Sequence, residues 1–189
     1  SHSNKNSPQA WLKVGTRVAL PDPELSPPLI AQQLLTATIK DQSYALLTVL
    51  EAKEGRVTLV GLSTIGIKLF TITYSQNHIE TEQNITAKGL PPATQILADI
   101  MLSYWPVSAW NPVLPPDWRL VDTANQRILY DDKNKIIIDV LYQSNLTDEH
   151  TDSTGRRDPI RVTHHAFGYQ INIQDMKTTH SPNLSTKTT

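Results

Sequence analysis

Apolar and polar residues alternate along most of this chain. Near the carboxyl end, Phe167, Tyr169 and Ile171 alternate with glycine and polar residues, which is typical of a strand with one buried and one solvated face. Such segments are separated by turn-forming pairs such as Glu54-Gly55, so antiparallel hairpins are expected. The pattern predicts about ten strands, at 29–40, 43–52, 56–62, 67–75, 78–82, 118–122, 127–130, 135–142, 160–165 and 167–175, with a shorter one at 17–20.

A helical period replaces this alternation in one segment, between Pro92 and Trp105. Its apolar residues recur at positions i, i+3, i+4 and i+7, which places them on one face of a helix. Pro91 and Pro92 suit the first turn of a helix, and Pro106 disfavours helical geometry at the residue before it. We therefore predict one helix of about three turns. It should pack across the concave face of the sheet through Ile96, Leu97, Ile100, Met101 and Tyr104, with Thr94, Gln95, Asp99 and Ser103 on its polar face.

Three of the predicted strands contain segments that are apolar on both faces, at 46–50, 67–74 and 136–141. Strands of this kind either lie between two layers or line an apolar cavity. Because one helix cannot cover so many strands, we expect a strongly curved sheet. The predicted fold is mainly β (α+β): an incomplete antiparallel β-barrel with a helical lid or plug and an apolar cavity inside. The ligand-cavity candidates are Leu46, Leu69, Phe70, Ile72, Ile100, Met101, Tyr104 and Trp105.

The length of the chain, 189 residues, is enough for one domain with a substantial core and short for two. We expect a single domain over residues 16–176. A flexible segment, 1–15, should precede it, and the Thr- and Ser-rich tail, 177–189, should be disordered. The polar stretch 147–159 should be a long surface loop.

Charge and composition exclude several classes of protein. The chain has 17 basic and 18 acidic residues, a net charge of -1 and no basic stripe, so nucleic acid is not an expected partner. The absence of cysteine excludes disulfides, thiolate catalysis and cysteine-based zinc sites. No apolar run approaches the roughly 18 residues that a membrane-spanning helix needs.

The sequence contains no combination of residues that predicts catalysis. His164 and His165 are adjacent, and adjacent residues of a strand point to opposite faces, so the two cannot share a metal ion in regular geometry. The charged stretch from Asp148 to Asp152 lacks the glycine placement of a calcium-binding loop. No dinucleotide, phosphate-loop, serine hydrolase or zinc protease motif occurs. We therefore expect a protein that is not an enzyme and that requires no cofactor or metal.

Two further features allow more than one interpretation. Ile65 occupies a turn between two predicted strands and is flanked by small residues; it either folds back into the core or projects as a contact for a membrane or a partner. The tryptophans either pack in the core with the indole N–H satisfied, or form the walls of a lipid-binding pocket. They are Trp11, Trp105, Trp110 and Trp118, and the last three surround the predicted helix.

Several of these segments together resemble a known family over residues 29–175. The resemblance is to an uncharacterised family of bacterial outer-membrane lipoproteins found in aryl polyene biosynthesis clusters. More distantly, the order of strands, turn and helix is similar to that of LolB, the outer-membrane lipoprotein receptor, and of LolA, its periplasmic partner. The matching segments are the run 59–70, Leu90-Pro91-Pro92, residues 99–106, Trp118-Arg119-Leu120 and Phe167-Gly168-Tyr169.

The resemblance implies an incomplete barrel closed by helices over an apolar cavity that holds acyl chains. It also implies an N-terminal lipid anchor upstream of Ser1, a place on the periplasmic face of the outer membrane and a LolA-like carrier as a partner. Ile65 matches in position a leucine with which LolB helps to insert lipoproteins, and is therefore the membrane-contact candidate. We expect a non-enzymatic protein that binds lipid, acyl or polyene chains, or lipoproteins. The alternative is an interaction lipoprotein with a filled core and no ligand.

Overall fold

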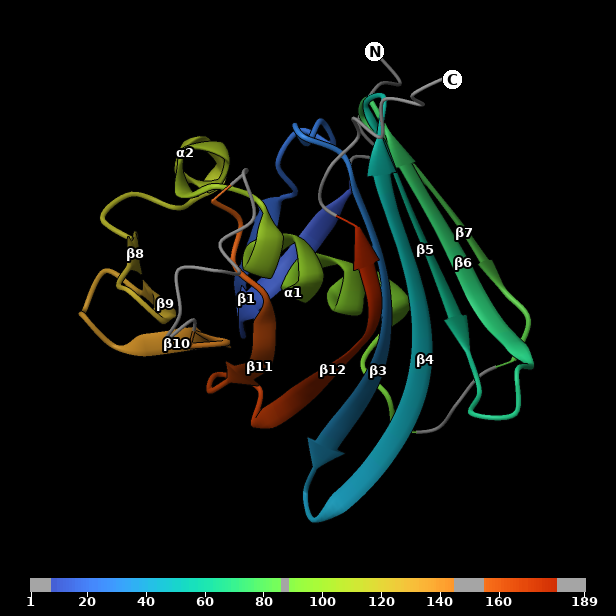
Figure 1. Ribbon diagram of the computed structural model, residues 1–189. Helices are drawn as coiled ribbons and strands as arrows, with labels where there is room; N and C mark the ends of the chain where they lie inside the picture. Colours follow the sequence, from blue (N-terminus) through green and yellow to red (C-terminus); the bar gives the residue numbers. More distant parts are fainter. Residues whose placement is uncertain (1–7, 86–88, 145–154, 180–189) are drawn as a thin grey trace.

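The structure is a computed structural model that describes residues 8–85, 89–144 and 155–179. One antiparallel sheet of ten strands dominates it, in the spatial order β7-β6-β5-β4-β3-β12-β11-β10-β9-β8 (Figure 1). The sheet is strongly curved and does not close, which confirms the predicted mainly β fold class. The strands are β3 (Leu29–Ile39), β4 (Gln42–Lys53), β5 (Arg56–Leu62), β6 (Lys68–Ser75), β7 (His78–Gln83), β8 (Arg119–Asp122), β9 (Gln126–Tyr130), β10 (Ile136–Tyr142), β11 (Pro159–His164) and β12 (Tyr169–Thr179).

The sheet consists of two meanders, β3–β7 and β8–β12, in which consecutive strands pair as hairpins. The meanders join where β12 pairs with β3, for example at Ile173 and Leu35. Register shifts interrupt the ladders β3–β12, β5–β6, β9–β10 and β10–β11. Such bulges bend a strand and increase its twist, so they contribute to the curvature.

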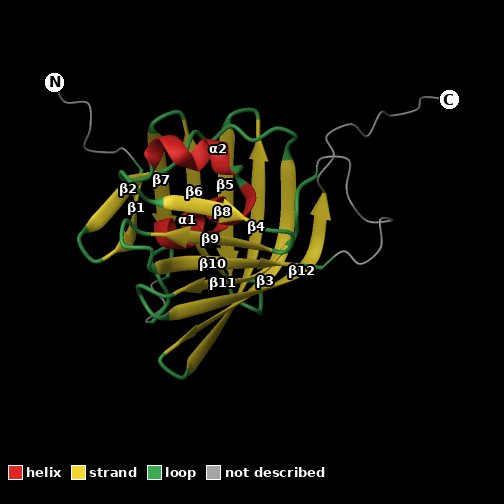
Figure 2. Ribbon diagram, turned by 90° about the vertical axis from the view of Figure 1, so that its left-hand side faces the viewer, coloured by secondary structure: helices red, strands yellow, loops and turns green. Residues whose placement is uncertain are grey.

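The predicted helix is present as α1 (Ala93–Tyr104) and lies within the curve of the sheet (Figures 1 and 2). Pro92 precedes its first residue, and the extended backbone of Trp105 ends it before Pro106. A shorter helix, α2 (Val107–Trp110), and a 3-10 turn, η1 (Asn111–Val113), lead to the second meander. No described helix has the length and apolar character that a membrane crossing requires.

The polar face of α1 is also buried, because all ten residues from Gln95 to Tyr104 are buried. A hairpin of β1 (Gln9–Lys13) and β2 (Thr16–Ala19), separate from the main sheet, contacts the helix. Ala10 and Leu12 of β1 belong to the hydrophobic core. The prediction of a flexible segment over 1–15 is therefore wrong for residues 9–13, which form β1. This strand is short and lies in a largely polar segment, so its alternation was not recognised.

The strands that are apolar on both parities use their two faces differently. On the concave face Leu46, Leu50 and Ile72 are at most 2 % exposed. On the convex face Leu47 and Val49 are half-buried, and no described helix or strand forms a second layer there. Apolar residues on both faces are thus typical of long central strands, whose convex face is partly covered by neighbouring side chains.

Two predicted irregular segments are only partly described. β12 continues to Thr179, which corrects the predicted disordered tail for residues 177–179, while 180–189 lie outside the described residues. Of the predicted loop 147–159, the part up to residue 154 lies outside them as well. Its last residue, Pro159, is the first of β11.

Candidate functional site

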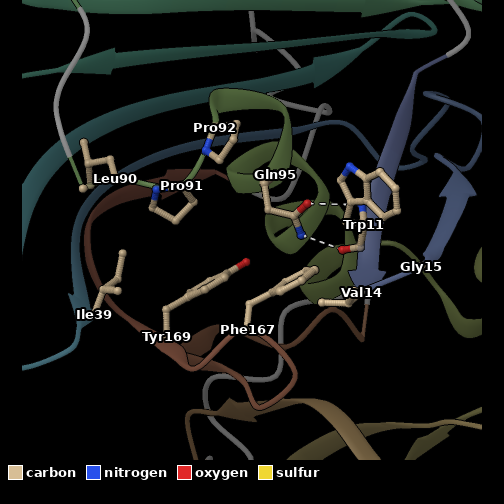
Figure 3. A pocket seen from close by; sticks show the side chains of 11 residues that line it. Trp11, Val14, Gly15, Ile39, Leu90, Pro91, Pro92, Gln95, Phe167 and Tyr169 are labelled. Atoms are coloured by element: carbon tan, nitrogen blue, oxygen red, sulfur yellow. Dashed lines mark hydrogen bonds between the residues drawn. The ribbon is translucent and has the colours of Figure 1, made fainter.

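A hollow of about 510 Å³ opens at the amino-terminal end of α1 (Figure 3). Four parts of the chain form it: the β1–β2 hairpin, the end of β3, the segment 89–92 with the first turns of α1, and the β11–β12 turn. In Figure 3, Phe167 and Tyr169 face Leu90 and Pro91 across the open space, and Ile39 lies beside Tyr169, its partner on the neighbouring strand. The volume is within the range of small-molecule sites. The lining residues are Trp11, Val14, Gly15, Ile39, Gly89, Leu90, Pro91, Pro92, Gln95, Phe167 and Tyr169.

The polar side chains that line this hollow are already engaged with the protein. The Gln95 Oε1 atom accepts from the Trp11 backbone N–H at 3.3 Å, and Gln95 Nε2 donates to the Trp11 carbonyl at 3.0 Å. This pairing of a side-chain amide with a backbone fixes β1 against α1. The Tyr169 hydroxyl donates to the carboxyl group of Asp99, one helical turn beyond Gln95.

Asp99 is completely enclosed behind Tyr169, and its environment changes its ionisation. Burial raises the pKa of Asp99 from 3.8 to about 7, although hydrogen bonds from Tyr169 and Gln95 oppose the change. Burial likewise raises the pKa of the Tyr169 hydroxyl, with a further contribution from Asp99. A carboxyl group in this position is largely uncharged below neutral pH.

His164 supports the aromatic wall of the hollow from behind. Its ring stacks on Phe167 and Tyr169, with centroid separations of 4.6 and 4.9 Å, and its Nδ1 accepts the Phe167 N–H at 3.2 Å. Burial lowers the pKa of His164 to about 4, so the ring is neutral at physiological pH. His165 is on the opposite side and contacts Asp139 at 2.5 Å. Within the described part of the chain, no three His, Asp or Glu residues are grouped as metal ligands would be.

The ligand-cavity candidates lie elsewhere, and most of them are in the packed core. Ile72, Ile100, Met101 and Trp105 are at most 3 % exposed and line none of the four hollows described here. Leu46 borders only a space of about 10 Å³. The space between α1 and the central strands is therefore filled, because the apolar helix face and the concave sheet face pack directly together.

Two other candidates, Leu69 and Phe70, line a second hollow of about 260 Å³ beside the first. The segment Leu90-Pro91-Pro92 borders both hollows and separates them. Gly89 places this segment: its φ is +96°, and a Cβ atom there would lie 2.3 Å from the Tyr44 hydroxyl. Only glycine allows the backbone to approach β4 so closely.

The last candidate, Tyr104, borders a polar hollow of about 260 Å³ at the other end of α1. Arg127 dominates this end, because its Nη1 donates to the carbonyls of Leu102 and Trp105 at 2.8 and 2.6 Å. These are last-turn carbonyls that the helix itself leaves unpaired. The Arg127 guanidinium also binds Asp122 at 2.7 Å. Burial alone would raise the pKa of Asp122, but the hydrogen bonds and charges of Arg127 and Arg157 outweigh it and lower the pKa.

The membrane-contact candidate projects from the molecule, since Ile65 is 81 % exposed. The turn that carries it is ordered by Ser63, whose Oγ accepts the Ile67 N–H at 3.0 Å and whose carbonyl accepts the Gly66 N–H at 2.9 Å. Gly66 has a φ of +85°, a conformation that favours glycine. Of the two interpretations of this turn, the structure therefore has the projecting one. Ile67 and Ile85 are also about half exposed, at 48 % and 46 %.

The tryptophans divide between the two interpretations. The indole of Trp105 donates to the Asp22 carbonyl at 3.0 Å, and that of Trp110 donates to the Met101 carbonyl at 3.1 Å, so both are satisfied core residues. Trp11 lines the first hollow, although it is not one of the three tryptophans that surround the predicted helix. Trp11 belongs to a strand of only five residues, and its neighbours in space come from distant parts of the chain.

Comparisons with known proteins give a family but no activity. The sequence model of a family described as "Protein of unknown function (DUF3261)" matches residues 30–177. No curated protein matches the chain. Among solved structures, this chain is similar to a domain described as an outer membrane lipoprotein-sorting protein from Vibrio parahaemolyticus. The two share 13% identity over 84% of this chain and 87% of that chain, with a TM-score of 0.44. It is also similar to a DUF1329 family protein from Desulfovibrio piger, with 10% identity, 86% and 89% covered, and a TM-score of 0.37.

Proposed function

We propose that this chain, which belongs to the DUF3261 family of proteins of unknown function, is a non-enzymatic lipid-binding protein of the bacterial outer membrane. It binds lipid, acyl or polyene chains, or the acyl chains of lipoproteins, and delivers them at the periplasmic face. In this proposal an N-terminal lipid anchors it, and a LolA-like periplasmic carrier supplies the cargo. Catalysis has no part in it.

One observation carries this proposal: the first hollow is apolar, and the polar side chains at its wall are hydrogen-bonded within the protein. A hydrocarbon chain gains about 0.8 kcal/mol for each methylene that leaves water. Such a wall can therefore bind a chain without any residue that reacts with it. The second hollow, behind Leu90-Pro91-Pro92, offers further apolar surface through Leu69 and Phe70.

Dye displacement tests the binding site. A hydrophobic dye should bind the folded protein and be displaced by fatty acids, and native mass spectrometry of protein extracted from cells should show a bound lipid. Ile39→Trp, which fills the first hollow, should weaken binding about tenfold, equivalent to 1.4 kcal/mol. Leu69→Trp reports on the second hollow in the same way.

The matched control is Leu47→Trp, because Leu47 is half-buried on the convex face of β4. All three variants should unfold at similar temperatures. Equal dye binding by Ile39→Trp, Leu69→Trp and the wild type would mean that the dye reports a surface patch, and the proposed site would be refuted.

The projecting turn supports the membrane part of the proposal. An isoleucine that leaves water at a membrane surface gains on the order of 1.5 to 3 kcal/mol, so Ile65→Glu should weaken liposome binding about tenfold or more. Its melting temperature should stay within a few degrees, since the side chain is 81 % exposed. Ile160→Glu is the control, because Ile160 is an exposed isoleucine on β11. Equal flotation of both variants with liposomes would exclude the contact.

A second function has an observation in its favour: the space between α1 and the central strands is filled, as in a protein that binds no ligand there. In that case the molecule is an interaction lipoprotein of an envelope assembly, and Ile65 contacts another protein. Absence of any lipid in native mass spectra, together with no displacement by fatty acids, would favour this function over the first.

A further inference from the structure

The inside of the first hollow does not suit a charged group. The Gln95 amide forms hydrogen bonds with the backbone of Trp11, and the Tyr169 hydroxyl donates a hydrogen bond to Asp99. A charged group placed there would lose its hydration without gaining these donors, which is strongly unfavourable. The part of a ligand that enters must therefore be uncharged.

A cation lies against Trp11, one of the residues that line the hollow. Arg17 lies opposite Trp11 across the β1–β2 hairpin, and its guanidinium carbon lies 5.0 Å from the centroid of the indole ring. Arg17 is exposed, and no described acidic side chain forms an ion pair with it. Lys13, on the same hairpin, differs because it is bound to Asp131 at 3.3 Å.

Partly exposed apolar side chains line this hollow. Trp11, Val14 and Phe167 all line the hollow and are 44 %, 85 % and 36 % exposed. The guanidinium thus stacks on the indole ring of a residue that lines the hollow. Arginine suits this position, since its planar group stacks on aromatic rings while its N–H donors stay free for a carboxylate or a phosphate.

We propose that the hollow takes a single hydrocarbon chain tail first, and that Arg17 binds the anionic head group of the same molecule at the mouth. The ligand class is a long-chain anion with a carboxylate or phosphate head. The hollow, at about 510 Å³, is within the size range of sites that hold a small molecule, so it has room for one chain. This inference rests on the proposed lipid-binding function and adds the orientation and charge of the ligand.

The expected contribution of Arg17 is modest, because its pair with the head group is exposed to solvent. Pairs of this kind change affinity by about two- to fivefold, and salt screens them. The effect should therefore appear as a preference among ligands with the same chain. It should not appear as loss of binding.

The test compares three probes with the same chain: dodecanoate, dodecyl phosphate and dodecanol. Their dissociation constants are measured by dye displacement at low and high salt, for the wild type, Arg17→Gln, Arg17→Lys and Arg56→Gln. Arg56 is a matched control, because it is exposed and begins β5 at the end of β4 remote from Ile39. Melting temperatures verify that each variant folds.

The wild type and Arg56→Gln should bind both anions about two- to fivefold more tightly than dodecanol at low salt, and the preference should vanish at high salt. Arg17→Gln should bind all three probes equally, at the affinity of dodecanol, while Arg17→Lys should keep most of the preference. Tighter binding of only one anion would identify the head group as carboxylate or as phosphate.

Three outcomes would overturn the proposal. Equal affinities of the wild type for all three probes would refute recognition of an anionic head group, while binding of the chain would still stand. A preference for anions that persists in Arg17→Gln would show that Arg17 is not the residue that binds the head group. If none of the probes binds, the proposed lipid-binding function itself fails, and the inference fails with it. Should Arg17→Gln not fold, the salt dependence of the wild type decides, because a preference insensitive to salt would exclude an exposed ion pair.

Discussion

The two faces of α1 are both buried, yet they are held by different forces. Ile96, Leu97, Ile100 and Met101 pack against the concave face of the sheet, and each gains about 1.5 to 3 kcal/mol by burial. Gln95 and Asp99, on the other face, bind the backbone of β1 and the hydroxyl of Tyr169 on β12. Hydrogen bonds of this kind contribute only about 0.5 to 1.5 kcal/mol net.

The difference shows that one face of the helix mainly stabilises the fold, whereas the other shapes the first hollow. The apolar face supplies most of the burial energy, and beyond Ile96, which borders the second hollow, it leaves no space for a ligand. The polar face contributes less energy, but it positions the hairpin with Trp11 and the strand with Tyr169, which are walls of the first hollow. A directional bond fixes a neighbour in one orientation, whereas apolar contacts tolerate small displacements.

The largest effect is expected on the apolar face, from Ile100→Asp. Ile100 is 3 % exposed, so an aspartate there would be a buried charge without a partner, and such changes cost several kcal/mol. The variant should fail to fold, as circular dichroism and size-exclusion chromatography would show. Ile100→Val is the control, with an expected loss of about 0.5 to 1.5 kcal/mol. A folded Ile100→Asp would mean that the helix does not pack as described.

The next largest effect is expected at Asp99 on the polar face, where a substitution should increase stability at neutral pH. The pKa of Asp99 is raised in the folded protein, from 3.8 to about 7, so the native state binds the proton more tightly than the unfolded state. The contribution of Asp99 to stability therefore falls as pH rises from about 4 to 7, and it is constant above that. A shift of about three pKa units corresponds to about 4 kcal/mol at most.

Asp99→Asn removes this titration and still provides an acceptor for Tyr169. The stability of the variant relative to the wild type should therefore increase between pH 4 and 7, as measured by urea denaturation at a series of pH values. Comparison of the two proteins cancels the contribution of His164, whose lowered pKa makes stability fall as pH decreases from about 6.5 to 4. A difference that does not change with pH would show that Asp99 is not enclosed.

The sequence predicted the helix and the strands because each depends on a local period. The alternation in 167–175 and the i, i+3, i+4 spacing around Ile100 are properties of neighbouring residues. A period states which residues share a face, but not what covers that face. Gln95 and Asp99 therefore indicated a polar face correctly, and nothing local indicated that β1 and Tyr169 bury it.

For the same physical reason, none of the predicted cavity residues lines the first hollow. Its walls come from residues as distant in sequence as Val14, Ile39, Leu90 and Phe167, and their meeting depends on the curvature of the whole sheet. Large apolar residues on the helix and on the central strands were natural candidates, but large residues also fill space best. Trp105 and Met101 occupy the core for that reason, and the opening lies where Gly15, Gly89 and two prolines leave room.

The smallest effect on stability is expected from Gln95→Met, which keeps the shape of the side chain and removes both hydrogen bonds to Trp11. The backbone N–H and carbonyl of Trp11 would then lack these partners, which costs about 1 to 3 kcal/mol. Urea denaturation should show this loss, and hydrogen exchange should show faster exchange of the Trp11 amide than of amides in β3. Thr94→Val is the matched control, because the Thr94 side chain forms no hydrogen bond with the described residues. Ligand affinity should fall with Gln95→Met and not with Thr94→Val, since only the first releases a wall of the hollow. If Gln95→Met leaves exchange at Trp11 unchanged, apolar contacts of Ala10 and Leu12 alone hold the hairpin, and the polar face of α1 has no role in positioning it.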